Sequence, residues 1–231
     1  MRAPINKRLL AAADFVRDGA VLADVGTDHA YLPIYLLSTG KIERAVLSDI
    51  NRGPLDKAEE NARSAGFLNS VSLHLSDGAA SLSGMGITDY SICGMGGELI
   101  ADIIDKAPHL KDGSIRLILQ PMSKPEALRE YLFKSGFEIC GERYVTDEGK
   151  HYVCILASYS GVAVSFSVAD TYFGKREVFF SADCDAFRAY MAGRKASLKR
   201  VIEGKRRGGI DSLFEEELLS ELCERLDLVS S

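Results

Sequence analysis

The chain has 231 residues, of which 46% are hydrophobic and 26% charged, and its formal net charge is −5. This composition is ordinary for a globular protein, and no tract approaches the roughly 18 consecutive apolar residues that a membrane-spanning helix needs. The composition thus argues against a membrane protein, and the acidic charge against a protein that coats nucleic acid by bulk attraction.

The first residues combine a basic residue with a short apolar stretch, as a secretory signal does. Asp14, Arg17 and Asp18 interrupt this stretch before an apolar core can form, so we expect a cytoplasmic protein. Five scattered cysteines never form a C-x-x-C pair, which signals neither a disulfide framework nor a metal site, and we expect buried thiols. We predict a monomer without an obligate protein partner.

Strands and helices alternate along the first two thirds of the chain. Short β-branched runs are separated by segments of helical periodicity, which indicates a mostly parallel sheet with helices on both faces. The last two strand runs are joined only by the turn-rich TDEGK, so we expect them to form an antiparallel hairpin. Strands are predicted at residues 20–25, 44–50, 71–77, 90–96, 115–121, 137–145 and 151–158, and helices at 32–37, 55–65, 98–107 and 124–135.

This order of elements predicts an α/β fold with a Rossmann-like sheet of the class I methyltransferase type and a terminal antiparallel hairpin. A nucleotide dehydrogenase would usually add a parallel sixth strand instead. Residues 160–174 are expected to be a connecting segment or edge strand. Helices at 186–205 and 213–228, joined by a short glycine-containing turn, should pack antiparallel in a coiled-coil-like module. We therefore predict a catalytic domain over residues 1–160 and a linker with a helical domain over residues 161–231.

The two C-terminal helices carry opposite charges. Residues 185–210 include eight basic residues and only two acidic ones, whereas from Asp211 onward acidic residues dominate. The global charge thus conceals a basic segment, which either grips RNA phosphates or is a solvated face paired with the acidic helix. The candidate RNA-binding residues are Arg194, Lys195, Lys199 and Arg200.

The strongest local motif is ADVGTDHAYLP at residues 23–33, where the first strand leads into a helix. Gly26 would let a cofactor approach the backbone, and the helix N-terminus supplies free N–H donors. The motif lacks G-x-G-x-x-G, which weakens a dinucleotide interpretation. The acids Asp24 and Asp28 suit a cationic ligand that carries an amino acid, such as S-adenosylmethionine. The structural alternative is a simple turn capped by Asp28.

Acids also follow the next two strands. Asp49, with Ile50 behind it, ends the second strand and has the position of a ribose-binding acid, and Asp77, followed by Gly78, ends the third strand beside an expected adenine. Either acid could instead cap a helix. Because open α/β sheets bind ligands at the carboxyl ends of their strands, three acids at neighbouring strand ends favour a nucleoside cofactor.

The fourth and fifth strands end in the segments CGMGG and LQP. The glycine-rich turn lacks the Asn-Pro-Pro-Tyr motif of many amino methyltransferases, yet its exposed backbone could admit a flat base next to the methyl donor. Glycines needed for tight packing are the alternative. From the same rim Gln120, followed by Pro121, could hydrogen-bond a base edge. The cofactor-binding candidates in the turn are Gly94, Met95, Gly96 and Gly97.

Together ADVGTDHAYLP, GMGG, LILQP and the Gly149–Tyr152 motif GK-x-Y resemble the bacterial tRNA adenine-N1 methyltransferases of the TrmK family, which act on adenosine at position twenty-two. The resemblance covers about residues 7–157. It implies a Rossmann-like catalytic domain that uses S-adenosylmethionine, tRNA as the partner, and a helical C-terminal domain. The sequence departs from the family at Met122, where asparagine commonly follows QP, and at Val153, where glutamate often follows the tyrosine.

The expected chemistry is an in-line transfer from a sulfonium to an adenine nitrogen, which rests on positioning more than on a strong base. Asp28 is the candidate for stabilising the charge that develops on the methylated base. His29 and Tyr31 are candidates for binding the flipped base or for lining the pocket of the methyl donor. His29 could equally satisfy the loop backbone. Residues alone do not separate N1 from N6 methylation.

Three other functions are compatible with parts of this pattern. A small-molecule methyltransferase would use the same cofactor pocket without the basic tail. A non-catalytic module would bind RNA or S-adenosylmethionine without turnover. A nicotinamide oxidoreductase is disfavoured by the missing glycine motif.

Overall fold

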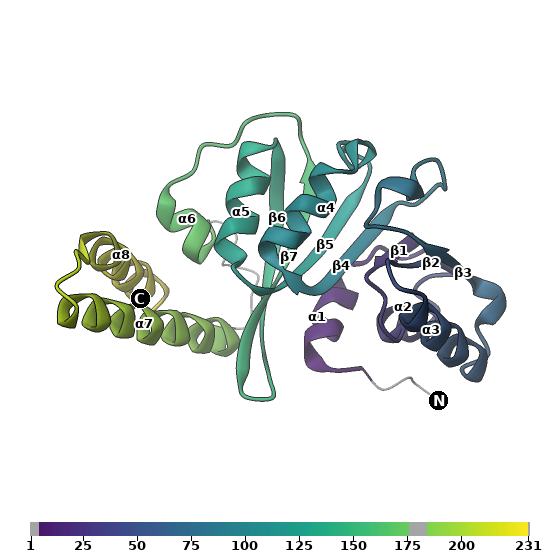
Figure 1. Ribbon diagram of the computed structural model, residues 1–231, viewed down its shortest axis with the longest axis horizontal. Coiled ribbons are helices and arrows are strands. Elements are labelled where there is room, and N and C mark those ends of the chain that lie inside the picture. The colour runs from purple at the N-terminus through teal and green to yellow at the C-terminus, as the bar shows by residue number, and fades with distance from the viewer. Residues whose placement is uncertain (1–4, 176–183, 231) are drawn as a thin grey trace.

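The computed structural model describes residues 5–175 and 184–230. A seven-stranded sheet in the order β3-β2-β1-β4-β5-β7-β6 forms its centre (Figure 1). All predicted strands are present, and the first five are parallel to one another. The strands are β1 (Val21–Val25), β2 (Arg44–Asp49), β3 (Val71–Leu75), β4 (Asp89–Gly96), β5 (Arg116–Ser123), β6 (Phe137–Asp147) and β7 (Lys150–Tyr159).

Helices cover both faces of the sheet. Successive side chains of each strand point to opposite faces, so apolar residues on both faces need to be buried. On β1, Leu22 packs in one apolar cluster with α1, α2 and α3, whereas Ala23 packs in a second cluster with α4 and α5. The fold class predicted from the sequence is confirmed. The helices around the sheet are α1 (Lys7–Phe15), α2 (Tyr31–Ser38), α3 (Arg52–Ser64), α4 (Gly97–Asp105) and α5 (Pro125–Lys134).

Helix α1 is an element that the sequence analysis did not identify. Asn6 caps it by accepting a hydrogen bond from the backbone N–H of Leu9 at 2.8 Å. Ala12 and Ala13 are buried on its inner side, and the helix lies against β5, β6 and β7. Burial of this inner side against the sheet stabilises the helix.

The hairpin of β6 and β7 is confirmed, with β7 antiparallel to both β5 and β6. Its two-residue loop places Glu148 at φ +48° and Gly149 at φ +75°. Two positive φ values match the turn that fits the twist of an antiparallel pair. The expectation of buried thiols is wrong in part, since Cys154 is buried but Cys140, on β6, is exposed.

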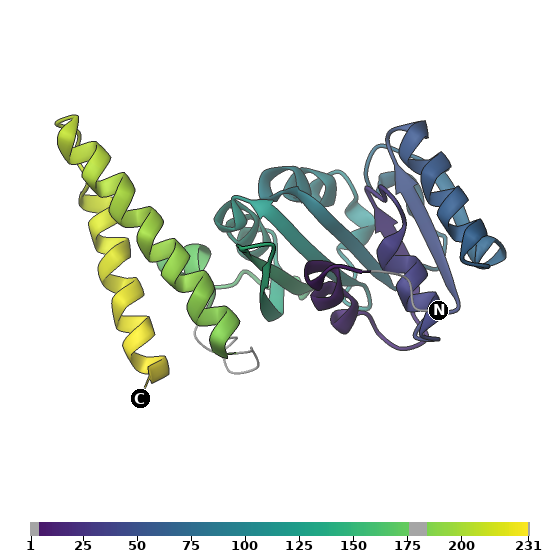
Figure 2. The same cartoon turned by 90° about the horizontal axis from the view of Figure 1, so that it is seen from below.

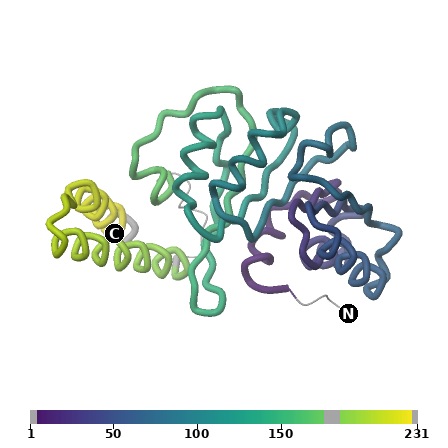
Figure 3. Tube along the Cα trace, in the orientation of Figure 1, coloured from purple at the N-terminus to yellow at the C-terminus, as the bar shows by residue number. Residues whose placement is uncertain are grey.

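The segment after the sheet differs from an edge strand. Residues 160–167 form an open loop that leads to α6 (Val168–Phe173) beside α5 (Figure 3). Ser167 and Asp170 form a reciprocal capping box that starts this short helix. The sequence S-V-A-D contains this capping motif, which was overlooked because the surrounding residues are small and show no helical periodicity.

The C-terminal helices α7 (Cys184–Arg207) and α8 (Leu213–Ser230) pack antiparallel, as predicted (Figure 2). Lys205 pairs with Glu215 at 2.7 Å and Arg206 pairs with Glu216 at 3.0 Å, so opposite charges join the two helices next to their turn. Within the described residues, no helix is both long and apolar enough to cross a membrane.

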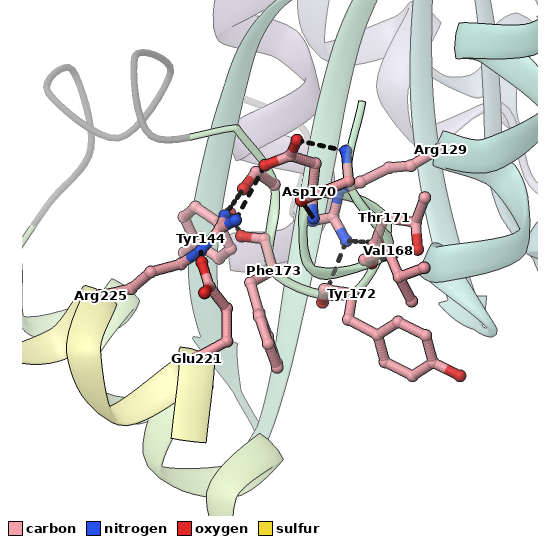
Figure 4. A network of polar contacts seen from close by, with 11 residues as sticks. Arg129, Tyr144, Val168, Asp170, Thr171, Tyr172, Phe173, Glu221 and Arg225 are labelled. Atoms are coloured by element: carbon pink, nitrogen blue, oxygen red, sulfur yellow. Dashed lines mark hydrogen bonds and ion pairs between the residues drawn. The ribbon is translucent and has the colours of Figure 1, made fainter. Parts of the chain in front are cut away.

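A buried polar network joins the sheet to the C-terminal helices through α6 (Figure 4). Arg129 of α5 donates to Glu142 of β6 at 2.6 Å and to the carbonyl of Thr171 in α6 at 3.0 Å. From α8, Arg225 donates to the carbonyl of Gly174 at 2.6 Å and to Asp170 at 2.9 Å. Helix α6 is therefore held from both sides.

Candidate active site

Two adjoining hollows open at the carboxyl ends of the parallel strands. The larger cavity measures about 440 Å³ and the smaller cavity about 230 Å³, and both are lined by Gly26, Asp49 and Met95. Asp77 lines the smaller cavity, so the ends of β1, β2 and β3 converge as the strand order requires.

The loop after β1 brings the backbone to the surface of the larger cavity. Gly26 has a φ of +75°, and a Cβ built there would collide with the methyl group of Met95. Helix α2 then begins at Tyr31, after the N-cap residue Ala30, which is left-handed (φ +56°) and provides no side-chain cap. Because no side chain caps this end of α2, its first backbone N–H groups can donate hydrogen bonds to a ligand.

Asp24 lies at the base of the larger cavity and is buried. Burial raises the pKa of its carboxyl group, and a hydrogen bond from Ser91 at 2.6 Å partly offsets that rise. A buried carboxylate of this kind gains most from a cationic ligand group, which would replace the lost hydration.

The three proposed catalytic residues line the larger cavity together. The carboxylate of Asp28 is exposed and lies 3.2 Å from Nε2 of His29. The ring of His29 stacks on that of Tyr31 with 5.1 Å between centroids. Nδ1 of His29 is buried and has no hydrogen-bond partner within the described chain.

The smaller cavity combines polar and apolar walls. Asp49 accepts a hydrogen bond from the N–H of Asn51 at 2.8 Å, which orients its carboxylate. Ile50 and Leu99 are 60% and 51% exposed and form apolar walls. Such walls accept the faces of a flat base. The sequence analysis missed Leu99. It lies on α4, and only the orientation of that helix in the fold shows that Leu99 lines the smaller cavity. Gly78 also lines this cavity.

The glycine-rich segment at the end of β4 and the start of α4 contains residues with two different roles. Gly94 and Met95 line the larger cavity. Gly97 is buried, and a Cβ there would collide with the carbonyl of Lys124. Gly96 lies against Ser123. Packing against the end of β5 therefore accounts for Gly96 and Gly97, which were expected to bind the cofactor.

Gln120 does not present its amide to a substrate as expected. It is fully buried, as is the neighbouring Pro121. Its Oε1 accepts a hydrogen bond from Arg8 of α1 at 2.5 Å, and its Nε2 donates to the carbonyl of Pro121 at 3.0 Å. The residue that reaches the larger cavity from this side is Arg8. Because 112 residues separate Arg8 from Gln120, no local sequence signal could reveal the contact.

The four basic residues of α7 that were expected to bind RNA differ in their surroundings. Arg194 pairs with Glu126 of α5 at 3.1 Å and lies 5.6 Å from the ring centre of Tyr172, so it holds α7 to the rest of the molecule. Lys199 and Arg200 are exposed. Across residues 5–175 and 184–230, neither these two nor Lys195 has a carboxylate within ion-pair distance.

The two hollows fit S-adenosylmethionine on several independent observations. Gly26 leaves a cradle that a side chain would fill, and Asp24 offers a buried acid to an ammonium group. The side chain of His29 lines the same cavity. Asp49 lies between the two cavities, where a nucleoside would place its ribose.

Comparisons with known proteins agree with this site. A methyltransferase-domain family matches residues 5–155. The tRNA (adenine(22)-N(1))-methyltransferase of Bacillus subtilis is 33% identical over 168 residues, which cover 70% of this chain and 71% of that protein.

Two solved structures extend the similarity over the whole chain. A Streptococcus pneumoniae candidate tRNA (m1A22) methyltransferase, in complex with S-adenosyl-L-methionine, superposes with a TM-score of 0.80 at 30% identity, covering 95% of this chain and 99% of that one. The Bacillus subtilis m1A22 tRNA methyltransferase TrmK superposes with a TM-score of 0.75 at 27% identity, covering 99% and 98%. This chain therefore belongs to the methyltransferase-domain family and, within it, to the TrmK family of tRNA (adenine(22)-N(1))-methyltransferases.

Proposed function

We propose that this protein transfers the methyl group of S-adenosylmethionine to N1 of an adenine in tRNA, the adenosine at position 22. The observation that carries the proposal is the pair of adjoining hollows lined by Gly26, Asp49 and Met95, in a chain of this family. A basic helix in the same chain favours tRNA over a small molecule as the substrate.

The cofactor supplies an electrophilic methyl group on a sulfonium, and N1 of adenine attacks it as the sulfur leaves as a thioether. N1 is unprotonated at neutral pH, so positioning supplies most of the rate enhancement. The stacked rings of His29 and Tyr31 offer a flat surface for a base that has left its helix. Tyr31 is 42% exposed and so remains accessible to it.

Methylation of N1 leaves the adenine cationic. The exposed carboxylate of Asp28 lies on the rim of the same cavity and stabilises that charge as it develops. It also accepts the proton that the exocyclic amine of the product then loses. In this mechanism Asp28 is the catalytic residue, whereas Asp24 faces the cofactor.

The second part of the proposal concerns the division of labour along the chain. Residues 1–160 bind the cofactor and the reacting base, and residues 161–231 hold tRNA through phosphate contacts. The face of α7 formed by Lys195, Lys199 and Arg200 supplies the positive charge. Arg194, which is paired with Glu126, contributes to the position of that face instead. The enzyme acts as a cytoplasmic monomer.

Incubation with isotope-labelled S-adenosylmethionine and an unmodified tRNA transcript, followed by nucleoside mass spectrometry, tests the proposal. We expect labelled N1-methyladenosine, and none with a transcript that has guanosine at position 22. Labelled N6-methyladenosine, or transfer that ignores the substitution at position 22, would overturn the assignment. Cofactor binding without any transfer to tRNA would favour a small-molecule enzyme or a non-catalytic module.

A further inference from the structure

The loop that connects β1 to α2 is anchored to neighbouring elements at two places. Near β1, the backbone N–H groups of Gly26 and Thr27 donate to the carbonyl of Ser48 at 2.8 and 3.0 Å. Near α2, Nδ2 of Asn61, on α3, donates to the carbonyl of His29 at 3.0 Å. Within the described residues, Asn61 provides the only side-chain hydrogen bond to the backbone of this loop. The half of the loop next to α2 therefore depends on this contact for its connection to α3.

The peptide that Asn61 holds lies between two residues assigned to the reacting base. It joins His29 to Ala30, whose φ of +56° is in the left-handed region, which a residue with a Cβ adopts at a cost in free energy. The rings of His29 and Tyr31, on either side of Ala30, stack with 5.1 Å between centroids and 23° between planes. Rotation of this peptide would change how the two rings lie, so the hydrogen bond from Asn61 maintains their stacking.

Helix α3 gives this contact a firm support. Ala58 and Ala62 of α3 are completely buried, in the same apolar cluster as Ala30. Asn61 itself is half-buried in the last turn of the helix. Asparagine is a weaker helix former than leucine or alanine, so helix formation alone does not favour it here. The hydrogen bond to His29 provides a reason for an amide at this position.

We propose that Asn61 is a positioning residue for methyl transfer, which fixes the stacked rings of His29 and Tyr31 through the carbonyl of His29. The inference rests on the proposed function, because that function assigns the two rings to the target adenine. Asn61 is not among the described residues that line either cavity. Its effect should therefore fall on the rate of transfer, which depends on the orientation of the base, and not on the binding of S-adenosylmethionine.

Asn61→Leu tests the proposal, since it keeps the approximate size of the side chain but removes the donor. We expect kcat for tRNA methylation to fall about 10- to 100-fold, because a misplacement of about 1 Å can have an effect of this size. The dissociation constant for S-adenosylmethionine, measured by calorimetry, should change less than about threefold. The melting temperature should not fall, because leucine is the better helix former. Asn61→Gln, which keeps the amide on a longer side chain, should retain more activity than Asn61→Leu.

Hydrogen–deuterium exchange measures the anchor directly and needs no turnover. In Asn61→Leu, amide exchange should become faster in a peptide that covers residues 26–32, and it should stay unchanged in β6 and β7. Ser64→Leu introduces the same side chain at an exposed position of the same helix. This matched control should change neither the exchange of the loop nor kcat.

A wild-type kcat in Asn61→Leu, or unchanged exchange of the loop, would overturn the proposal. A lower melting temperature with equal losses in kcat and in S-adenosylmethionine affinity would also overturn it, because it would show a general structural effect. Failure of the proposed function is read separately. The wild-type protein would then form no N1-methyladenosine in tRNA, whereas the exchange difference between Asn61→Leu and the wild type would still report the anchor.

Discussion

Substitution of Arg129 by methionine should destabilise the protein and loosen the C-terminal helices. Arg129 is completely buried and forms hydrogen bonds of 2.6 and 3.2 Å with Glu142, which is 1% exposed. Removing the cation leaves a buried carboxylate whose remaining bond is that from Tyr144 at 2.5 Å. Breaking a buried pair in this way costs about 3 to 5 kcal/mol in the free energy of unfolding.

The structure also predicts a functional effect. Arg129 holds the carbonyl groups of Thr171 and Tyr172 at 3.0 and 3.4 Å, and α6 in turn binds Arg225 of α8 (Figure 4). Loss of Arg129 should therefore raise the KM for tRNA more than it raises the dissociation constant for S-adenosylmethionine. The residues of this network do not line either cavity of the site.

Urea unfolding followed by circular dichroism measures the stability change. Arg129→Met combined with Glu142→Met should lose about 1 to 3 kcal/mol less than the sum of the single variants, since the double variant leaves no unpaired buried charge. The control Arg52→Met breaks an exposed pair with Asp56 and should have little effect. A loss below about 1 kcal/mol for Arg129→Met, or additive losses in the double variant, would refute the reasoning.

Three further predictions concern the site. Gly26→Ala should weaken S-adenosylmethionine binding in calorimetry, because a Cβ at a φ of +75° strains the backbone and displaces the Met95 methyl group at the cavity wall. Burial raises the pKa of Asp24 above 3.8, so its protonated form stabilises the folded state and this contribution is lost as the pH rises through the raised pKa. Relative to Asp24→Asn, wild-type thermal stability should fall, and S-adenosylmethionine affinity rise, across that window. Lys199→Glu with Arg200→Glu should weaken tRNA binding at least about tenfold and reduce its salt dependence, at unchanged cofactor affinity.

Each of these predictions has a control variant or a result that would contradict it. For the basic face of α7, Lys57→Glu with Arg63→Glu introduces the same charge change on α3, at the other end of the molecule (Figure 2), and should leave tRNA affinity nearly unchanged. Equal losses in both double variants would indicate a general charge effect. A wild-type pH profile that parallels that of Asp24→Asn would contradict the Asp24 assignment. A Gly26→Ala protein that binds S-adenosylmethionine as tightly as the wild type would contradict the role of Gly26 in the cavity.

Local patterns in the sequence determined the sheet and the approximate position of the site. Alternation of strands and helices predicts parallel pairing, and parallel pairing brings the ends of successive strands to one edge. The acids Asp24, Asp49 and Asp77 were therefore identifiable without coordinates. The hairpin was predictable because TDEGK is too short for a crossover helix, and the antiparallel pair α7 and α8 because the turn between them is short.

Tertiary contacts decided what each side chain faces. Gln120 and Gly97 stand in motifs that suggested ligand contacts, yet Gln120 binds Arg8 and Gly97 packs against Lys124. Arg194 belongs to a basic run, and a partner 68 positions away neutralises it. Arg8 stands in a segment without any motif, and only the packing of α1 on the sheet brings it to the cavity. Periodicity predicts which face of an element is buried, because it depends on neighbouring residues. It contains no information on partners far along the chain, which the folded arrangement alone brings within hydrogen-bond distance.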